Sequence, residues 1–246
     1  MLTSLQNSTV KQLRKLQQPK ERRKQALLLL EGTHLLEAAC EVQYPLQVLC
    51  YTETWAHRHE GRLESAIALC AQVELVSPEV LKSIASTVTP DGALATAPRR
   101  NVWQAESGAP GKDIQLGVML ETLQDPGNLG TIIRTAAAVG ADGLWLSPDS
   151  VDLGHPKVLR ASVGQWFRVP MATAEMVAQT QELRELGVQV VVMGNEGAGL
   201  SDELRACASV SVKIPVMPAV ESLNVAISTA LLLYEARRQR ATFQAG

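Results

Sequence analysis

Three stretches in the C-terminal half of the chain place polar side chains and glycines directly after apolar runs. The first is Asp125–Asn128 (DPGN), followed by an apolar stretch in which Arg134 stands alone. Aspartate is a favoured N-cap and proline fits the first helical position, so DPGN predicts a tight turn that begins a helix. A guanidinium whose sequence neighbours are apolar either extends to solvent or faces an anion.

The second stretch is Gly194–Ser201 (GNEGAGLS), directly after a run of valines. Glycines let a backbone approach a ligand closely. Their order here is G-x-x-G-x-G, which is neither the dinucleotide fingerprint nor a P-loop. The stretch therefore predicts a loop that receives a nucleoside through backbone N–H and C=O groups, and Glu196 is either part of that site or an ordinary turn residue.

The third stretch is Ile214–Asn224 (IPVMPAVESLN). Its two prolines end a strand and stiffen the loop that follows. Ser222 is expected to cap a long helix, and capping alone would explain it. Asn224 would then lie in the first turn of a very apolar helix, where a buried amide needs a hydrogen-bond partner.

The elements around these stretches alternate between strands and helices, which predicts an α/β fold. Near-continuous apolar runs such as 114–120 and 188–193 are typical of buried parallel strands, and ligands bind at the carboxyl edge of such sheets. Strands are expected at 26–30, 46–51, 73–76, 92–97, 114–120, 143–146, 167–169, 188–193 and 210–214. Helices are expected at 8–16, 33–40, 62–72, 78–86, 126–139, 173–186 and 222–240, the last of them mostly buried.

Residues 98–113 interrupt this alternation with two prolines, two glycines and little periodicity. They are interpreted as a linker between an N-terminal domain, 1–97, and a C-terminal domain, 114–246. The four cysteines show no metal-ligand or disulfide spacing, which favours a reducing cytosol, and no metal is expected. We see no signal peptide, and the aliphatic run 26–30 is too short to span a membrane.

The formal net charge of −2 hides a basic N-terminus, because residues 1–24 carry seven Lys or Arg against Glu21 alone. Such a local patch favours phosphate binding, although a charge run is also typical of a solvated helix face. The candidate phosphate-binding residues are Lys11, Arg14, Lys15, Arg22, Arg23 and Lys24.

Taken together and in this order, the three stretches resemble the signature motifs of the SpoU/TrmH family of RNA 2′-O-ribose methyltransferases. The resemblance includes N-x-x-x-x-x-R in the first, GNEGxGLS in the second and ESLN in the third. Further similarity lies in Pro156–Gly164 and, for the family's substrate-binding domain, in Leu30–Gly32 and Pro90–Gly92.

The resemblance implies a C-terminal α/β trefoil-knot methyltransferase domain plus a smaller N-terminal α/β RNA-binding domain. The sequence pattern alone predicts an unknotted sheet, because knots are rare. The family's S-adenosylmethionine pocket is formed by the knotted loops, and members are usually homodimers that pair through the knot, with Arg134 near the partner's cofactor. The implied cofactor contacts are Gly194, Asn195, Gly197, Gly199, Ile214, Met217 and Leu223.

The implied reaction moves a methyl group from a sulfonium to a ribose hydroxyl. A guanidinium is a reluctant base, so we favour Arg134 as a stabiliser of the developing alkoxide, while the family proposal of Arg as general base stays open. The residues expected to orient Arg134 and the ribose are Asn128, Glu196, Ser222 and Asn224.

The basic N-terminal domain would grip RNA, with ribosomal RNA favoured over tRNA by family resemblance, and the protein would work in the cytoplasm. Three other interpretations are weighed. A non-catalytic RNA-binding protein on the same fold is disfavoured by the intact Arg134, Glu196 and Asn224. A base-nitrogen methyltransferase stays open, and a nicotinamide dehydrogenase lacks its fingerprint.

Overall fold

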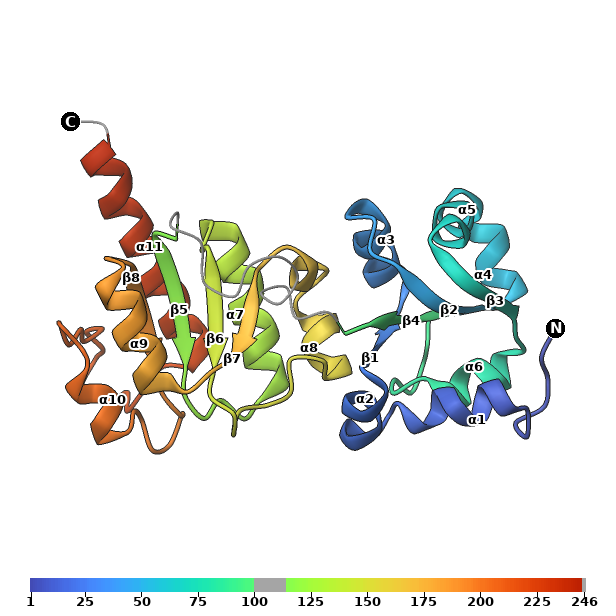
Figure 1. Ribbon diagram of the computed structural model, residues 1–246, viewed down its shortest axis with the longest axis horizontal. Coiled ribbons are helices and arrows are strands. Elements are labelled where there is room, and N and C mark those ends of the chain that lie inside the picture. The colour runs from blue at the N-terminus through green and yellow to red at the C-terminus, as the bar shows by residue number, and fades with distance from the viewer. Residues whose placement is uncertain (100–113, 245–246) are drawn as a thin grey trace. The chain divides into compact units, whose positions relative to one another are not determined.

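In the computed structural model, residues 1–99 and 114–244 are described, with side chains through residue 240. The chain folds as two units (Figure 1). Unit 1 comprises Met1–Arg100 and Asp152–Phe167, and unit 2 comprises Asn101–Val151 and Arg168–Gly246. The described residues of each unit combine helices with a sheet, so the α/β fold class is confirmed. The predicted linker 98–113 lies outside the described residues from residue 100 onward.

The sheet of unit 1 has four strands in the order β1-β4-β2-β3. The strands are β1 (Leu27–Glu31), β2 (Leu46–Tyr51), β3 (Cys70–Leu75) and β4 (Ala93–Pro98). β4 is antiparallel to both β1 and β2, whereas β2 and β3 are parallel. The helices of its N-terminal part are α1 (Ser8–Lys15), α2 (Pro19–Gln25), α3 (Thr33–Glu41), α4 (Glu53–Arg58), α5 (Glu60–Ala68) and α6 (Pro78–Ile84). α1, α2 and α6 cover one face of the sheet, and α3, α4 and α5 cover the other (Figure 1).

The basic helix α1 forms because its apolar residues recur at helical spacing. Val10 and Leu13 turn inward and pack with Ile84 of α6 in one apolar cluster. Asn7 caps the helix by accepting a hydrogen bond from Thr9 N at 2.8 Å. Pro19 does not merely end this helix, as predicted, but begins α2 at its first turn.

Segment 152–167 belongs to unit 1 although its sequence lies inside the range 114–246 predicted for the C-terminal domain. It contains α8 (Pro156–Ala161) and the 3₁₀ turn Gln165–Phe167, where a strand was expected at 167–169. Arg160 pairs with Glu31 of β1 at 3.0 Å. The indole of Trp166 donates to Leu153 O at 3.0 Å.

Unit 2 is built on four parallel strands in the order β7-β6-β5-β8. The strands are β5 (Leu116–Leu120), β6 (Gly143–Leu146), β7 (Met171–Thr173) and β8 (Gln189–Met193). Its helices are α7 (Pro126–Val139), α9 (Met176–Glu185), α10 (Asp202–Ala206) and α11 (Val225–Gln244). α7 and α11 cover one face of this sheet and α9 covers the other (Figure 1).

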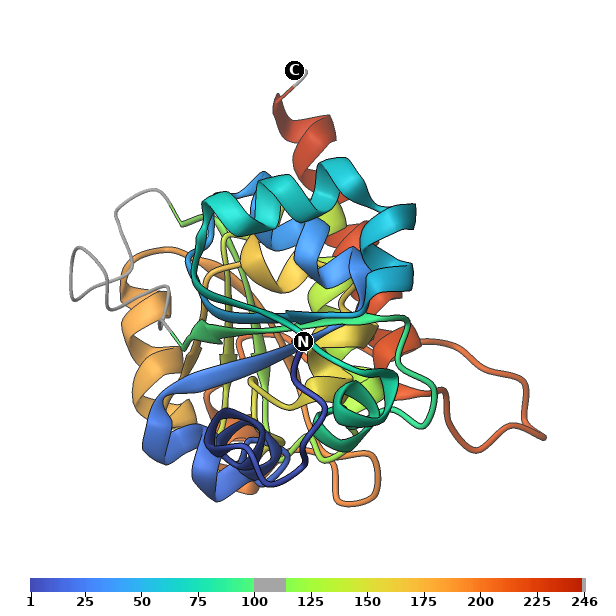
Figure 2. The same ribbon diagram turned by 90° about the vertical axis from the view of Figure 1, so that its right-hand side faces the viewer.

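The predicted strand 210–214 is wrong. Val210 and Val212 are 74% and 66% exposed, and the whole stretch 208–224 is exposed apart from the half-buried Ile214. The alternation of apolar and polar residues there fits a strand, but no neighbouring strand pairs with it among the described residues. Figure 2 shows this stretch, in orange to red, projecting away from the rest of its unit.

Helix α11 begins at Val225, three residues later than predicted, because Asn224 caps it rather than Ser222. It is also less buried than its apolar sequence predicted. Ile227, Leu231 and Tyr234 are 52%, 49% and 53% exposed and follow one another at helical spacing. A single chain therefore leaves an apolar stripe uncovered along this helix.

No helix within residues 1–99 and 114–244 has both the length and the apolar character needed to cross a membrane.

Candidate functional site

The strand order of unit 2 sets the position of the site. The chain runs outward from β5 to β6 and β7, then returns so that β8 pairs with the other side of β5. The order thus reverses between β5 and β8, and ligands of α/β proteins bind at such a switch point, outside the carboxyl ends of the strands. The loop 121–125 after β5 leads into the first predicted motif, and the loop 194–201 after β8 is the second.

The first motif folds as its sequence predicted. Asp125 accepts a hydrogen bond from Asn128 N at 2.8 Å, and Pro126 occupies the first turn of α7. Ile132 and Ile133 are fully buried and anchor the helix on the sheet. This packing places Asn128 in the first turn, at the carboxyl edge of β5.

The loop after β5 is held by a turn that sequence reasoning missed. Thr122 adopts a positive φ of 54°, and its N–H donates to Ser147 Oγ at 2.7 Å. Its hydroxyl donates to Asp149 at 2.8 Å, and Leu123 N donates to Ser150 Oγ at 3.0 Å. Hydrogen bonds from Ser147 and Thr122 lower the pKa of the Asp149 carboxyl. The run of Ser, Pro and Asp after β6 is a recognisable turn signal that could have identified this support.

The second motif forms a tight loop organised by Asn195. The Asn195 side chain accepts from Gly197 N at 2.8 Å and Ala198 N at 3.0 Å, and its amide donates to Thr122 O at 2.9 Å. The backbones of Asn195 and Gly199 exchange two hydrogen bonds of 2.9 Å. A Cβ at Gly194 would lie 2.3 Å from the backbone of Gly199, so only glycine fits there.

Side chains from all three motifs meet at Asn128. Its amide nitrogen donates to the Glu196 carboxylate, and its amide oxygen accepts from Asn224 Nδ2 at 3.0 Å. Asn224 in turn caps α11 by accepting from Ala226 N at 2.9 Å. The structure therefore brings together Asn128, Glu196 and Asn224, which we call the polar relay. Each member has defined partners and remains accessible to solvent.

Ser222 and Arg134 lie apart from the polar relay. Ser222 is exposed, and its predicted capping role is wrong because Asn224 supplies the cap. Arg134 is exposed on α7 and makes no hydrogen bond or ion pair to a described residue. It lies six positions after Asn128, which turns its side chain about 120° around the helix relative to that of Asn128. Within one chain, the guanidinium does not face the relay.

The third motif contributes an open loop. Met217 is 73% exposed and Leu223 is 37% exposed, while Ile214 is half-buried. Met217 lines a shallow hollow formed within residues 213–221. Among the described residues, no hydrogen bond joins this loop to Gly194–Gly199. The cofactor candidates within Gly194–Gly199 therefore share one loop, and the three candidates of the third motif lie in a separate loop.

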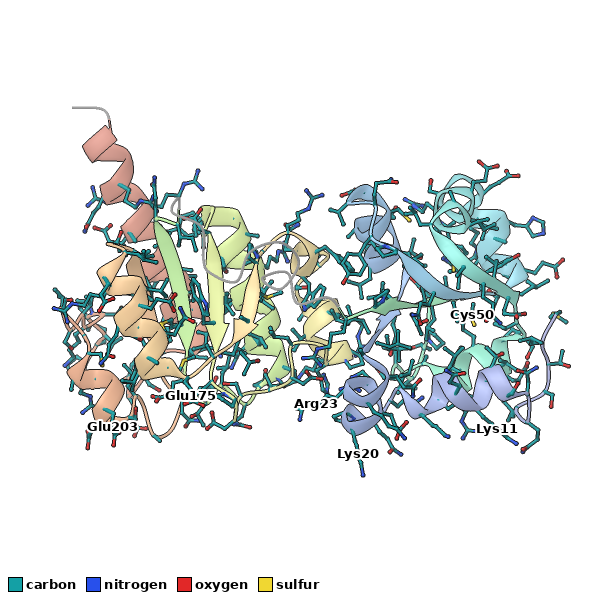
Figure 3. The ribbon with its side chains drawn as sticks, in the orientation of Figure 1. Lys11, Lys20, Arg23, Cys50, Glu175 and Glu203 are labelled. Atoms are coloured by element: carbon teal, nitrogen blue, oxygen red, sulfur yellow. The ribbon has the colours of Figure 1, made fainter. Side chains whose placement is uncertain are left out.

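The basic residues of α1 and α2 form an exposed face of unit 1, with one exception. Figure 3 shows Lys11, Lys20 and Arg23 along the same side of the two helices. Arg22 is only 1% exposed, and its Nη1 donates to Leu16 O at 2.9 Å. It also pairs with Asp152 at 3.5 Å. Its prediction as an RNA contact is therefore wrong. The candidates that remain on the exposed face are Lys11, Arg14, Lys15, Arg23 and Lys24.

Comparisons with known proteins match both halves of the chain. A sequence model of the SpoU rRNA methylase family matches residues 115–234, and one of the MRM3-like substrate-binding domain matches residues 7–95. An uncharacterized tRNA/rRNA methyltransferase of Synechocystis is 43% identical over 97% of this chain and 94% of its own length. RlmP of Bacillus subtilis, a 23S rRNA guanosine 2′-O-methyltransferase, is 29% identical over 96% of this chain and 98% of its length. The AdoMet-bound rRNA methyltransferase of Sinorhizobium meliloti superposes with a TM-score of 0.81 at 29% identity, covering 97% of both chains.

Proposed function

Since this chain belongs to the SpoU rRNA methylase family and is an S-adenosylmethionine-dependent RNA 2′-O-methyltransferase, we propose that the polar relay at the β5–β8 switch point is its active site. The observation that carries this proposal is the hydrogen-bonded contact of Asn128, Glu196 and Asn224, one residue from each motif.

The loop after β8 fits the adenosyl part of S-adenosylmethionine. Residues 196–199 are exposed, and the glycines on both sides of Ala198 leave backbone groups accessible beside the switch point. Such groups can read a nucleoside without a charged side chain. We assign cofactor binding to Gly194–Gly199, with Ile214, Met217 and Leu223 as further candidates. The family's trefoil knot, which would bring those three to the same loop, remains an expectation.

When bound, the cofactor would supply an electrophilic methyl group and leave as a neutral thioether. The protein must orient a ribose hydroxyl, whose proton passes to solvent as the oxygen takes the methyl group. The polar relay offers amide and carboxylate groups whose directions are set by one another. Asn128 and Asn224 would hold the ribose, and Glu196 fixes the orientation of the Asn128 amide. Arg134 stabilises the alkoxide as it forms, because a guanidinium presents several donors and stays charged.

Arg134 would act on the relay of a second copy of the chain, because it faces away from its own. The uncovered stripe of Ile227, Leu231 and Tyr234 on α11 supports a homodimer of this kind. Unit 1 would hold the RNA through phosphate contacts of α1 and α2. By its relatives' substrates we propose ribosomal RNA, and hence a cytoplasmic site of action.

Methyl transfer from tritiated S-adenosylmethionine to ribosomal RNA tests the proposal. Wild-type protein should label the RNA, and Arg134→Ala should lose most of the label while Arg184→Ala, on the exposed side of α9, should retain it. The labelled nucleotide should resist alkaline cleavage of its 3′ linkage. Label that appears without such resistance would favour methylation of a base nitrogen, and no label on any RNA would favour a non-catalytic binder.

A further inference from the structure

Glu121 is the first residue after β5, and it lies in none of the three motifs. Its backbone N–H donates to Met193 O at 2.9 Å, extending the pairing of β5 with β8 by one residue. Its carboxylate accepts two hydrogen bonds from Ser201, one from the backbone N–H at 2.7 Å and one from the hydroxyl at 2.6 Å. One residue therefore contacts both the last residue before the cofactor loop and the last residue of that loop.

The chemistry of these contacts requires a carboxylate. Ser201 presents two donors to Glu121, and its hydroxyl oxygen also accepts from Leu204 N at 3.3 Å to cap α10. The hydroxyl proton must then point to Glu121. A carboxylate has two acceptor oxygens for the two donors, whereas a glutamine amide would turn an NH₂ group toward one of them.

The consequence is a loop with both ends fixed. Between Met193 and Ser201 the chain makes the tight turn organised by Asn195, whose amide is bound by Thr122, the neighbour of Glu121. Residues 121 and 122 thus contact the residue that precedes the loop, the interior of the loop and its last residue. A loop ordered before the ligand arrives binds it more tightly, because less conformational entropy is lost on binding.

We propose that Glu121 is a positioning residue that holds the cofactor loop 194–201 in its binding conformation by clamping Ser201. The inference rests on the proposed use of this loop for S-adenosylmethionine. Glu121 acts through Ser201 and makes no contact with the reacting atoms. Its loss should therefore weaken cofactor binding and leave the affinity for RNA unchanged.

Isothermal titration of the full chain with S-adenosylhomocysteine tests the clamp. We expect Glu121→Gln to raise Kd about tenfold or more, the factor for one charge-assisted hydrogen bond. Ser201→Ala should raise it about threefold to tenfold, and Ser201→Thr, which keeps the hydroxyl, should restore it. The double variant should bind no more weakly than Glu121→Gln alone, within about twofold, because both changes remove one contact.

Asp142 provides a matched control. Its carboxylate accepts from Gln115 N and Leu116 N, both at 2.9 Å, at the opposite end of β5. Asp142→Asn should leave Kd unchanged. The inference is refuted if Glu121→Gln binds like wild type, or if Asp142→Asn weakens binding as much.

Two further outcomes are distinguishable. If wild-type protein does not bind S-adenosylhomocysteine, the cofactor assignment itself fails. If Glu121→Gln does not fold, the Ser201→Ala and Ser201→Thr pair decides, and equal affinities for those two variants overturn the clamp.

Discussion

Asn224 performs two tasks that substitutions can separate. It caps α11 through its side-chain oxygen, and its amide nitrogen donates to Asn128 at 3.0 Å. Asn224→Ala removes both interactions. Asn224→Asp keeps the capping oxygen and places a negative charge where the helix dipole favours it, but its carboxylate has no proton to donate.

The magnitudes follow from these contacts. Losing the cap should cost Asn224→Ala about 1 kcal/mol of unfolding free energy, or about 2–4 °C in Tm for a chain of this size. Asn224→Asp keeps the cap, so it should be about 1 kcal/mol more stable to unfolding than Asn224→Ala. Both variants lose the bond to Asn128, worth about 1 kcal/mol, so methyl transfer should fall at least about fivefold in each.

A flip of the Asn128 amide cannot restore the lost hydrogen bond in Asn224→Asp. If the amide flipped to donate to the carboxylate that Asn224→Asp introduces, its oxygen would face the Glu196 carboxylate, and two acceptors would repel. Thermal unfolding and methyl-transfer rates of the two variants are the assays, with Asn224→Ser as an uncharged variant that keeps a capping oxygen. Full activity in Asn224→Asp would refute the relay, and a Tm loss equal to that of Asn224→Ala would refute the cap.

Three further predictions concern the rest of the molecule. Arg22→Ala removes the buried guanidinium that donates to Leu16 O and pairs with Asp152, which keeps only Arg99, so urea unfolding should show a loss of about 1.5–3 kcal/mol. The exposed Arg23→Ala should stay within about 0.5 kcal/mol, and equal stability of the two variants would contradict a structural role for Arg22. Burial raises the pKa of Asp152, but Arg99 and Arg22 together hold it below its ordinary value of 3.8, so its stabilising contribution should be present above pH 3.8 and lost as the pH falls further. Asp152→Asn should reduce the loss of unfolding free energy as the pH falls below 3.8. An unchanged pH dependence would contradict the stabilising role of the Asp152 carboxylate. Leu231→Glu should convert the proposed homodimer to a monomer in light-scattering measurements, whereas Glu235→Gln should not. A dimeric Leu231→Glu would show that the α11 stripe is not the interface.

Local signals in the sequence predicted the elements that local interactions determine. Asp125 and Pro126 begin α7 as expected, because a cap and a first-turn proline act on the next three residues only. The GNEGAGLS loop was likewise expected after a valine strand, and it follows β8 directly. The contact among Asn128, Glu196 and Asn224 could be anticipated only from the order of the motifs and the family resemblance.

The errors come from interactions between distant parts of the chain. Arg22 is indistinguishable from its basic neighbours in sequence, and its burial depends on Asp152, which lies in another part of the chain. Ser222 and Asn224 are both good N-caps, and the start of α11 at Val225 decides between them. The strand expected at 210–214 is absent. Alternation of apolar and polar residues shows that a segment could bury one side as a strand, but it does not show whether a partner strand is present.

The central claim is that the loops after β5 and β8 and the residue before α11 converge on the methyl donor. A crystal structure of the protein with S-adenosylhomocysteine measures this directly. The account predicts ligand density against Gly194–Gly199 at the β5–β8 switch point, with Asn128 still bonded to Glu196 and Asn224 beside it. Density at another place on the molecule, or a ligand at that edge with the three side chains separated, would contradict it.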